Sequence, residues 1–315
     1  MQRAARASIW TVALCLATVY VVWGTTYFAI KVAIQGLPTF FLVGTRFLVA
    51  GSVLLAAQLL RRPRMPQLTE WRNAALLGVL FLVLGNGFIA VAEHHISSGA
   101  TVALGSVIPL ATALWSGVFG HWPRRVEWMA IALGALGAAV MLLGRDLQAS
   151  PLGALTVLLG VTSWSFGIVL SPRLRVPPGA LGFGAEMLCA GVIGLALSAL
   201  LGEHWSLPRT PQVWGAWVYL VVFGSLVGFS AFRFLVERVS ATLASTYAYV
   251  NPPVALLVGW ALGSESFSPS LFVGLPLVLS GVALHAWAHA RSSAPRVPAP
   301  DASAAAVPGN AVSAP

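Results

Sequence analysis

Two ionisable side chains interrupt long apolar stretches of the sequence: Arg46 lies within residues 38–60 and Glu186 within residues 180–201. A charge at membrane depth costs roughly 2.5 to 3.5 kcal/mol on insertion scales, so it is kept where it binds a solute or pairs with another group. A guanidinium suits an anionic group on a small molecule, and a carboxylate suits a cationic one. The alternative is structural: a buried pair, or a charge capped by carbonyl groups, that only holds helices together.

Other side chains in the apolar stretches could contact the same solute. Hydroxyl and amide groups offer hydrogen bonds, and two tryptophans at nearly equivalent places could stack on a flat molecule. Most aromatic residues inside apolar helices only pack, so a packing role stays open for each of them. These candidates are Trp23, Thr26, Tyr27, Asn86, Trp164, Tyr247 and Asn251.

The elements that must position these residues follow from composition. Of the 315 residues, 58% are apolar and 9% are charged, against roughly 25% charged in soluble domains. A soluble fold is therefore excluded, and in lipid a spanning helix needs roughly 20 apolar residues. We predict an all-α integral membrane protein. Its ten transmembrane helices are expected near residues 9–31, 38–60, 72–92, 97–119, 127–144, 151–171, 180–201, 212–233, 240–262 and 270–289.

The basic residues indicate the orientation of the chain. The net charge of +9 comes from 18 basic residues in short clusters between apolar runs, a pattern that argues against a nucleic-acid partner. With the N-terminus inside, 14 of the 18 fall on the cytoplasmic side, and only Lys31, Arg145 and Arg209 fall on the other. This asymmetry predicts that both termini are cytoplasmic. The composition of residues 291–315 predicts a disordered cytoplasmic tail.

The sequence repeats itself at an offset of about 140 residues. Residues 44–51 align with residues 184–191, and the offset rises only to 144 at Gly137 and Gly281. Each copy holds five expected spans, an odd number, so the second copy must enter the membrane in the opposite orientation. The predicted fold is therefore two inverted five-helix repeats, N-in and C-in. The first repeat covers residues 1–147 and the second covers residues 148–290.

Prolines mark the fourth and ninth spans as broken helices. Pro109 and Pro252 occupy equivalent places in the two repeats, and proline removes a backbone donor and frees a carbonyl one turn earlier. Lipid would not tolerate such a break, whereas a cavity would, and corresponding broken helices point to a substrate path between the repeats. A simple packing kink is the alternative.

The inverted arrangement places the two charges at different depths. Arg46 lies about eight residues from the outer side, and Glu186 lies about six residues from the cytoplasmic side. At about 1.5 Å per residue their depths differ by roughly 10 Å. We therefore expect both to face a central cavity at different levels, without a direct ion pair.

Several classes of activity lack the residues they need. The sequence has no phosphate-binding loop ending in Gly-Lys-Ser/Thr, and Asp146 and Asp301 lie outside the spans, so neither ATP-driven pumping nor intramembrane proteolysis is expected. Glu93, His94 and His95 lack the spacing of a zinc site and are expected to form a solvated loop at the outer end of the third span. We expect no enzymatic activity, no cofactor and no metal.

Four segments carry a family likeness: Trp23–Phe28, Gly44–Phe47, Gly85–His94 and Ser245–Pro252. Together they resemble the ten-span EamA branch of the drug/metabolite transporter superfamily over roughly residues 8–288. The resemblance implies a carrier that exports small metabolites, often amino acids or related compounds, across the bacterial inner membrane. It does not name the substrate.

Two departures from the superfamily limit what the resemblance implies. Four-span relatives couple export to protons through a glutamate in their first helix, whereas the first and sixth spans here contain no carboxylate, so that route is unsupported. Many relatives carry an acidic residue after Gly at the end of the ninth span. It is Glu265 here, after Ser264, and His121 and Trp122 stand at the matching place in the first half.

Taken with the resemblance, the residues predict an alternating-access exporter of small, partly apolar metabolites, with a small-molecule substrate and the lipid bilayer as partners. An amino acid suits a cavity with one arginine and one glutamate at different levels. A channel-like facilitator or uniporter is the alternative, although no charge ring or filter sequence is visible. The coupling ion and the oligomeric state stay open.

Overall fold

The computed structural model describes residues 8–60, 65–143, 150–238, 247–263 and 265–293. Within these ranges the secondary structure is helical, without a β-strand, so the expected all-α class is confirmed. Eight helices are long and apolar enough to cross a membrane, and Val250–Gly263 and Pro269–His285 are shorter apolar helices. These apolar regions overlap the expected spans. Residues 240–246 of the expected ninth span and residues 294–315 of the expected tail lie outside the described residues, and residues 291–293 belong to the last helix.

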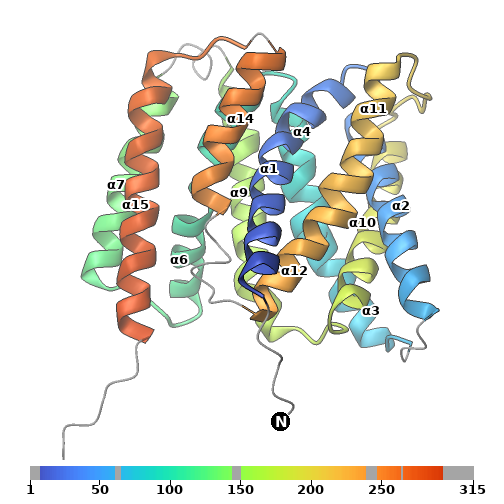
Figure 1. The fold of residues 1–315 in the computed structure, drawn as a ribbon, viewed down its shortest axis with the longest axis horizontal. Helices are drawn as coiled ribbons and strands as arrows, with labels where there is room; N and C mark the ends of the chain where they lie inside the picture. Colours follow the sequence, from blue (N-terminus) through green and yellow to red (C-terminus); the bar gives the residue numbers. More distant parts are fainter. Residues whose placement is uncertain (1–7, 61–64, 144–149, 239–246, 264, 294–315) are drawn as a thin grey trace, which may run out of the picture.

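The helices run up and down through one bundle (Figure 1). The first half contains α1 (Ile9–Ala33), α2 (Thr39–Leu59), α3 (Leu68–Gly78), η1 (Val79–Asn86), α4 (Gly87–Ala92), α5 (Ser98–Gly105), α6 (Ile108–Val118) and α7 (Arg125–Leu142). The second half contains α9 (Pro151–Leu170), η2 (Ser171–Arg173), α10 (Ala180–Leu200), α11 (Pro211–Tyr219), η3 (Leu220–Val227), α12 (Gly228–Arg238), α14 (Tyr247–Gly263) and α15 (Pro269–Ser293). We refer to the end of the bundle where α1 begins as the lower end, and to the opposite end as the upper end.

The third and eighth apolar regions share a composite build. Helix α3 continues into the π-helix η1 and then α4, and α11 continues into the π-helix η3 and then α12. Each π-helix is eight residues long, and they begin at Val79 and Leu220, positions that the sequence repeat brings nearly into register. A π-helical stretch is rare, changes the direction of the side chains that follow, and is frequent at functional sites.

The fourth apolar region is broken where Pro109 predicts. Ser106 and Val107 separate α5 from α6, and Pro109 stands in the first turn of α6. Proline fits there because the first N–H groups of a helix have no partner within it. The break lies beside the upper cavity described below, which Gly105 and Ile108 line.

The ninth apolar region differs from this prediction. Pro252 and Pro253 lie inside α14, which continues through them to Gly263, so the expected break at Pro252 is wrong for the described helix. Helix α1 packs along α14 and supports it. Neighbouring helices commonly make a proline tolerable inside a membrane helix.

The most extensive contacts between the two halves of the chain are those of α2 with α10 and of α7 with α15 (Figure 1). In the first pair a Cβ at Gly51 would lie 2.4 Å from the backbone nitrogen of Leu188, and a Cβ at Gly191 would lie 2.4 Å from the backbone nitrogen of Leu48. The contacts are reciprocal, because the sequence repeat aligns Leu48 with Leu188 and Gly51 with Gly191. Such reciprocity is typical of a two-fold relation between the partners.

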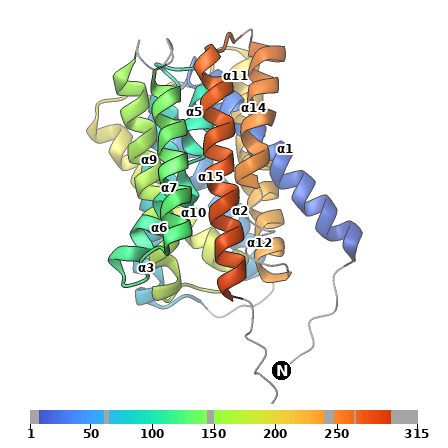
Figure 2. The same cartoon turned by 90° about the vertical axis from the view of Figure 1, so that its left-hand side faces the viewer.

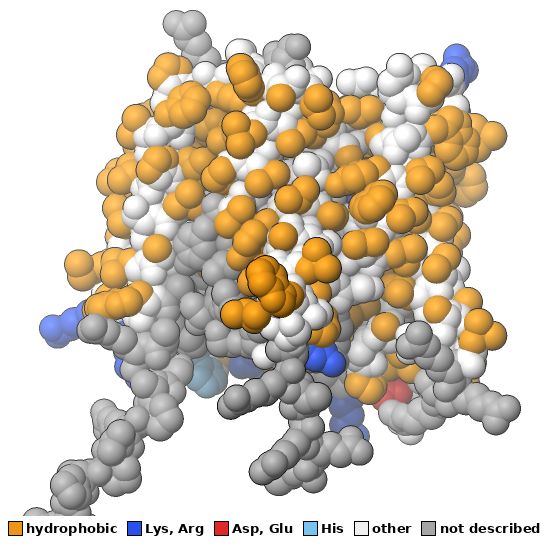
Figure 3. All heavy atoms as spheres, in the orientation of Figure 1, with side chains coloured by type: hydrophobic (Ala, Val, Ile, Leu, Met, Phe, Trp, Pro, Cys, Tyr) orange, Lys and Arg blue, Asp and Glu red, His pale blue; other side chains and the backbone are white. Residues whose placement is uncertain are grey.

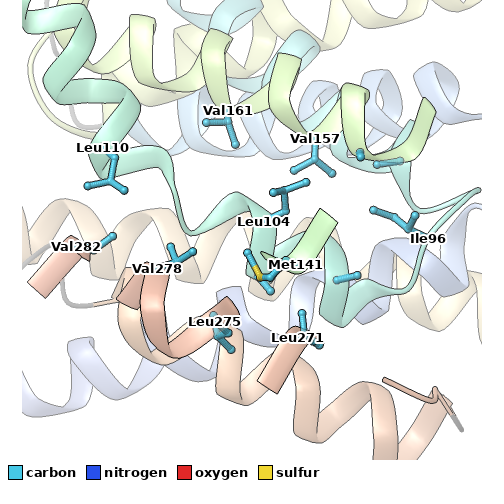
Figure 4. Packing of buried hydrophobic residues seen from close by; sticks show 14 of the residues in the cluster. Ile96, Leu104, Leu110, Met141, Val157, Val161, Leu271, Leu275, Val278 and Val282 are labelled. Atoms are coloured by element: carbon cyan, nitrogen blue, oxygen red, sulfur yellow. The ribbon is translucent and has the colours of Figure 1, made fainter. Parts of the chain in front are cut away.

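A buried apolar cluster holds the second pair against the broken helix. Leu104 of α5, Met141 of α7, Val157 of α9 and Val278 of α15 are almost completely buried. Figure 4 shows their side chains meeting between these helices. The cluster fixes α5 against α9, and both helices line the cavity that contains the candidate site.

The outer surface of the bundle is strongly apolar. Figure 3 shows hydrophobic side chains over most of the visible face, with Lys and Arg mainly along the lower edge. Trp10 is 81% exposed, and Trp260 and Phe272 are exposed to a similar degree. Figure 2 shows α1 leaning away from the other helices toward its lower end, where Trp10 lies. A surface of this kind requires a lipid or partner environment rather than water.

Two glutamates of the second half cap helices of the first half at the upper end. Glu203 accepts hydrogen bonds from the backbone N–H groups of Phe40 at 3.0 Å and Phe41 at 2.9 Å, at the start of α2. Glu265 accepts from the backbone N–H of Ser98 at 3.0 Å and from its hydroxyl at 2.9 Å, at the start of α5. Carboxylates stabilise helix N-termini by satisfying free N–H groups and opposing the helix dipole.

Candidate substrate site

The described residues enclose an upper and a lower cavity inside the bundle. The upper cavity, of about 100 Å³, is surrounded by α1, α2, both composite helices, α5, α6, α9 and α14. The lower cavity, of about 340 Å³, is surrounded chiefly by α1, η1, α9, α10, α12 and the connection from η2 to α10. Eight predicted residues line the upper cavity: Trp23, Thr26, Tyr27, Arg46, Asn86, Trp164, Tyr247 and Asn251.

Arg46 is held against the second π-helix. Its side chain is 5% exposed, and its Nε donates a hydrogen bond of 3.0 Å to the hydroxyl of Ser225, which in turn donates to the Leu220 carbonyl at 3.0 Å. The guanidinium carbon lies 4.7 Å from the centre of the Phe47 ring. The η3 segment therefore supplies the hydroxyl that orients the charge, and Arg46 remains part of the cavity wall.

The neutral polar residues of the upper cavity have partners in their own helices. Thr26 donates to the Trp23 carbonyl at 2.6 Å, and the Asn86 amide donates to the Phe81 carbonyl at 3.2 Å. The Asn251 amide nitrogen can donate to the Tyr247 carbonyl at 3.2 Å. These bonds reduce the cost of burying the polar groups. The side-chain oxygen atoms can still accept hydrogen bonds from a solute in the cavity.

Four aromatic side chains line both cavities and form what we term the aromatic layer: Trp23, Trp164, Phe229 and Tyr247. The Trp23 ring lies 5.2 Å from Phe229 and 5.1 Å from Tyr247, centre to centre, in edge-to-face contact. Edge-to-face pairs of this kind add to the energy of area burial. The aromatic layer forms the boundary between the upper and the lower cavity.

Glu186 lies on the other side of the aromatic layer. It is 7% exposed and lines the lower cavity, together with Pro177 and Phe183 near the lower end. Arg46 and Glu186 thus line different cavities, in agreement with the different depths that the sequence predicts for them. Their roles in transport stay predictions.

Two predicted residues line neither cavity. Pro109 is half-buried in the first turn of α6, beside the lining residue Ile108. Pro252 is buried beside the lining residue Asn251. Each proline therefore adjoins the upper cavity only through a neighbouring residue, and a role in transport stays a prediction for both.

Sequence reasoning missed the glycines that open the upper cavity. Gly85 and Gly224 line it from the two π-helices. A Cβ at Gly85 would lie 2.9 Å from the Trp164 ring, and a Cβ at Gly224 would lie 3.0 Å from Nη2 of Arg46. The available signal was their spacing, which is close to the repeat offset, but glycine is common throughout this chain.

Glu93 corrects the expectation of a solvated loop after the third span. Its side chain is completely buried, and the neighbouring His94 lies within hydrogen-bond distance of Thr39, Nε2 to Oγ1 at 3.0 Å. Lys31 donates to the backbone carbonyls of Glu93 and Ile96. His94 and His95 are exposed, so the expectation of a solvated loop is wrong for Glu93 and correct for the two histidines. The Glu93 side chain is buried at a place that the sequence of the connection alone does not reveal.

The comparison with known families identifies the chain. The sequence profile described as the EamA-like transporter family matches residues 10–143 and 151–287. The chain belongs to the EamA-like transporter family. The likeness seen in the sequence motifs is therefore confirmed, and this EamA protein is a membrane transporter, which implies a small-molecule substrate and a lipid environment.

Individual relatives agree with this assignment. The EamA protein is 40% identical over 272 residues to the inner membrane transporter YedA of Escherichia coli (strain K12), covering 85% of this chain and 88% of the relative. It is 27% identical over 274 residues to Protein PecM of Dickeya dadantii (strain 3937), covering 83% of this chain and 87% of that protein. One crystal structure, 21% identical, superposes with a TM-score of 0.62 over 92% of this chain and 100% of its own, which supports the fold.

Proposed function

We propose that this EamA protein is an alternating-access carrier that exports small metabolites bearing a carboxylate, of the amino-acid type, across the bacterial inner membrane. The observation that carries the proposal is Arg46. It is a buried cation in the wall of an internal cavity, held by Ser225 from the opposite half of the chain. A guanidinium binds carboxylates in a bidentate, charge-assisted manner. Glu186 is the residue proposed to bind the ammonium group of the substrate.

The proposed topology is ten spans in two inverted repeats, with both termini cytoplasmic. Three observations support it: the reciprocal contacts of α2 with α10, the two π-helices at matching places, and a family match in each half. The asymmetry of basic residues supports the orientation. In this arrangement the upper cavity faces the outer side, and the lower cavity faces the cytoplasm.

For the substrate to pass from one cavity to the other, the side chains of the aromatic layer, which separates the two cavities, must move aside. In the present conformation the larger cavity is the lower one, so substrate enters from the cytoplasm beside Glu186. Rocking of one half against the other widens the upper cavity around Arg46 and narrows the lower one. This is the usual motion of transporters built from repeats, with the site between them.

The test compares the metabolites released into the medium by cells that overproduce the protein and by cells that lack it. Arg46→Ala should abolish the difference while membrane abundance stays unchanged, and Arg46→Lys should restore only part of it because lysine lacks the bidentate fork. Arg209→Ala is the matched control, since Arg209 is exposed at the upper end. Normal export by Arg46→Ala would assign Arg46 to helix packing.

A channel-like facilitator is the alternative that the same residues allow. Once the medium comparison supplies a released compound, flux in reconstituted vesicles separates the two. A carrier saturates and shows counterflow, whereas a channel shows neither. Flux without counterflow would replace the alternating-access mechanism with a facilitator.

A further inference from the structure

Glu93 presents an unexplained buried acid at the upper end of the bundle. Its side chain is 0% exposed, and neither carboxyl oxygen has a hydrogen-bond partner among the residues that the structure describes. A buried ionised carboxylate without hydrogen bonds is strongly unfavourable, whereas the neutral acid is much less so. An orphaned polar group of this kind in a native structure requires a specific reason.

A cation lies beside the acid but is used elsewhere. The Lys31 ammonium donates to the backbone carbonyls of Glu93 and, at 3.0 Å, of Ile96, just beyond the end of α4. A cation at this place satisfies free carbonyls and complements the helix dipole. Lys31 thus holds the main chain of Glu93 while the carboxyl of the same residue stays without a hydrogen bond.

Two other ionisable residues, Glu265 and Tyr27, interact electrostatically with the Glu93 carboxyl. Glu265 binds the N-terminus of α5, and Tyr27, one turn before Lys31 on α1, interacts electrostatically with Glu93. Burial raises the pKa of Glu93 well above its ordinary value of 4.5; the Lys31 ammonium lowers it, and Glu265 raises it. The carboxyl is therefore poised between a neutral form and a form paired with Lys31.

The neighbouring histidines complete the set of titratable groups. Burial lowers the pKa of His94, as do His95 and Lys31, whereas Glu203 raises it. His94 contacts Thr39 at the start of α2. Lys31 is the cation that hydrogen-bonds to the Glu93 main chain, so Glu93 and Lys31 are the two groups that can exchange partners at this place.

We propose that Glu93 is a proton-binding site and that Lys31 is its alternate counter-ion. With the proton bound, the carboxyl is neutral and Lys31 holds the two backbone carbonyls, as in this structure. When the proton leaves to water, the carboxylate draws the Lys31 ammonium away from those carbonyls. One proton is released, Lys31 keeps its charge, and α1 moves relative to the α4–α5 connection.

The exchange acts on the upper cavity through α1. Tyr27 and Ile30 line that cavity and precede Lys31 on the same helix, so a shift of α1 at Lys31 alters the upper end of the cavity. If the protein is the carrier proposed above, this effect of the exchange on the upper cavity makes the proton the coupling ion; this step rests on the proposed function. The proton site itself stands on the burial and contacts of Glu93 alone.

Infrared spectroscopy of the full chain in liposomes, titrated from acidic to alkaline pH, tests the site with the proton as the only ligand. The wild type should show the carbonyl-stretch band of a buried protonated carboxylic acid, and the band should disappear as pH rises. Glu93→Gln should remove the band. Glu93→Asp should keep a band at a shifted position. Glu127→Gln is the control, because Glu127 accepts the Arg124 N–H in a capping box that glutamine also supports.

Lys31→Met tests the counter-ion. Without the ammonium the carboxylate loses its partner, so the midpoint of the band should rise by about 1 to 3 pH units. A spectrum without any band that depends on Glu93 would overturn the proton site, and an unchanged midpoint in Lys31→Met would overturn the exchange. Because the readout uses no substrate, failure of the export assay with Arg46 variants would leave this result standing, and the reverse also holds.

Discussion

The contact of α2 with α10 makes a quantitative prediction at Gly51. Gly51→Ala would place a Cβ 2.4 Å from the Leu188 backbone nitrogen and 2.9 Å from the Gly184 carbonyl oxygen, whereas ordinary contact begins at 3.4 Å. Backbone atoms cannot turn aside as a side chain can, so the helices must separate by about 1 Å. A gap of 0.5 to 1 Å forfeits roughly a quarter to a half of the dispersion attraction across it.

The expected loss of stability follows from this separation. Overpacking of a close-packed interface costs about 1 to 3 kcal/mol. Gly215→Ala on α11 is the matched control, because a Cβ there meets nothing within 4 Å; it should gain about 0.5 to 1 kcal/mol from helix propensity. Both glycines lie inside helices, so the propensity gain applies to both variants and cancels in the comparison. The two variants should therefore differ by about 1 to 3 kcal/mol in the free energy of unfolding.

The assay is thermal unfolding of the purified variants in detergent, followed by tryptophan fluorescence. Gly51→Ala should unfold several degrees below Gly215→Ala, and Gly191→Ala should match Gly51→Ala because the contacts are reciprocal. The double variant should lose less than the sum, since one separation accommodates both methyl groups. If Gly51→Ala unfolded at or above the temperature of Gly215→Ala, the close backbone contact of α2 with α10 would be incorrect.

Three further predictions concern polar contacts. Glu265→Ala removes the cap of α5 and should lower the unfolding temperature by an amount equivalent to about 0.5 to 2 kcal/mol; an unchanged temperature would mean that the cap is dispensable. Ser225→Ala removes the acceptor for Arg46 Nε and should reduce stability by about 1.5 to 3 kcal/mol together with export, whereas wild-type behaviour in both would contradict the positioning role. Because the pKa of Glu93 is raised in the folded protein, the folded state binds the proton more tightly than the unfolded state, so wild-type stability relative to Glu93→Gln should fall as pH rises above 4.5. Unfolding temperatures measured at several pH values check this sign, and parallel curves for the two proteins would contradict it.

Much of the candidate site could be predicted from residue types alone. Arg46, Asn86 and Asn251 stand out because polar groups are rare in apolar helices, and rarity at membrane depth usually reflects a use. Each of them lines the upper cavity. Pro109 indicated the broken helix correctly. A proline is tolerated better in the first turn of a helix than in its interior, and a new helix, α6, begins beside Pro109.

The errors share one physical cause. Burial of a side chain in a connection depends on which distant segments pack against it. The polar sequence Glu93–His95 suggested solvent for all three residues, whereas the fold exposes the two histidines and buries Glu93. Pro252 suggested a break, but α14 continues through it and packs against α1. The glycines of the cavity were hidden among many glycines that only permit helix packing.

The sequence by itself determined that the chain is a helical protein in lipid, because a chain with few charges and long apolar runs is not stable in water. It also determined the family, because four short motifs occur in order along the chain. The tertiary structure alone decided which side chains share a cavity, where the π-helices turn the third and eighth regions, and that Glu93 is buried next to Lys31. These properties depend on contacts between residues far apart in the chain. Local composition and spacing carry no record of those contacts.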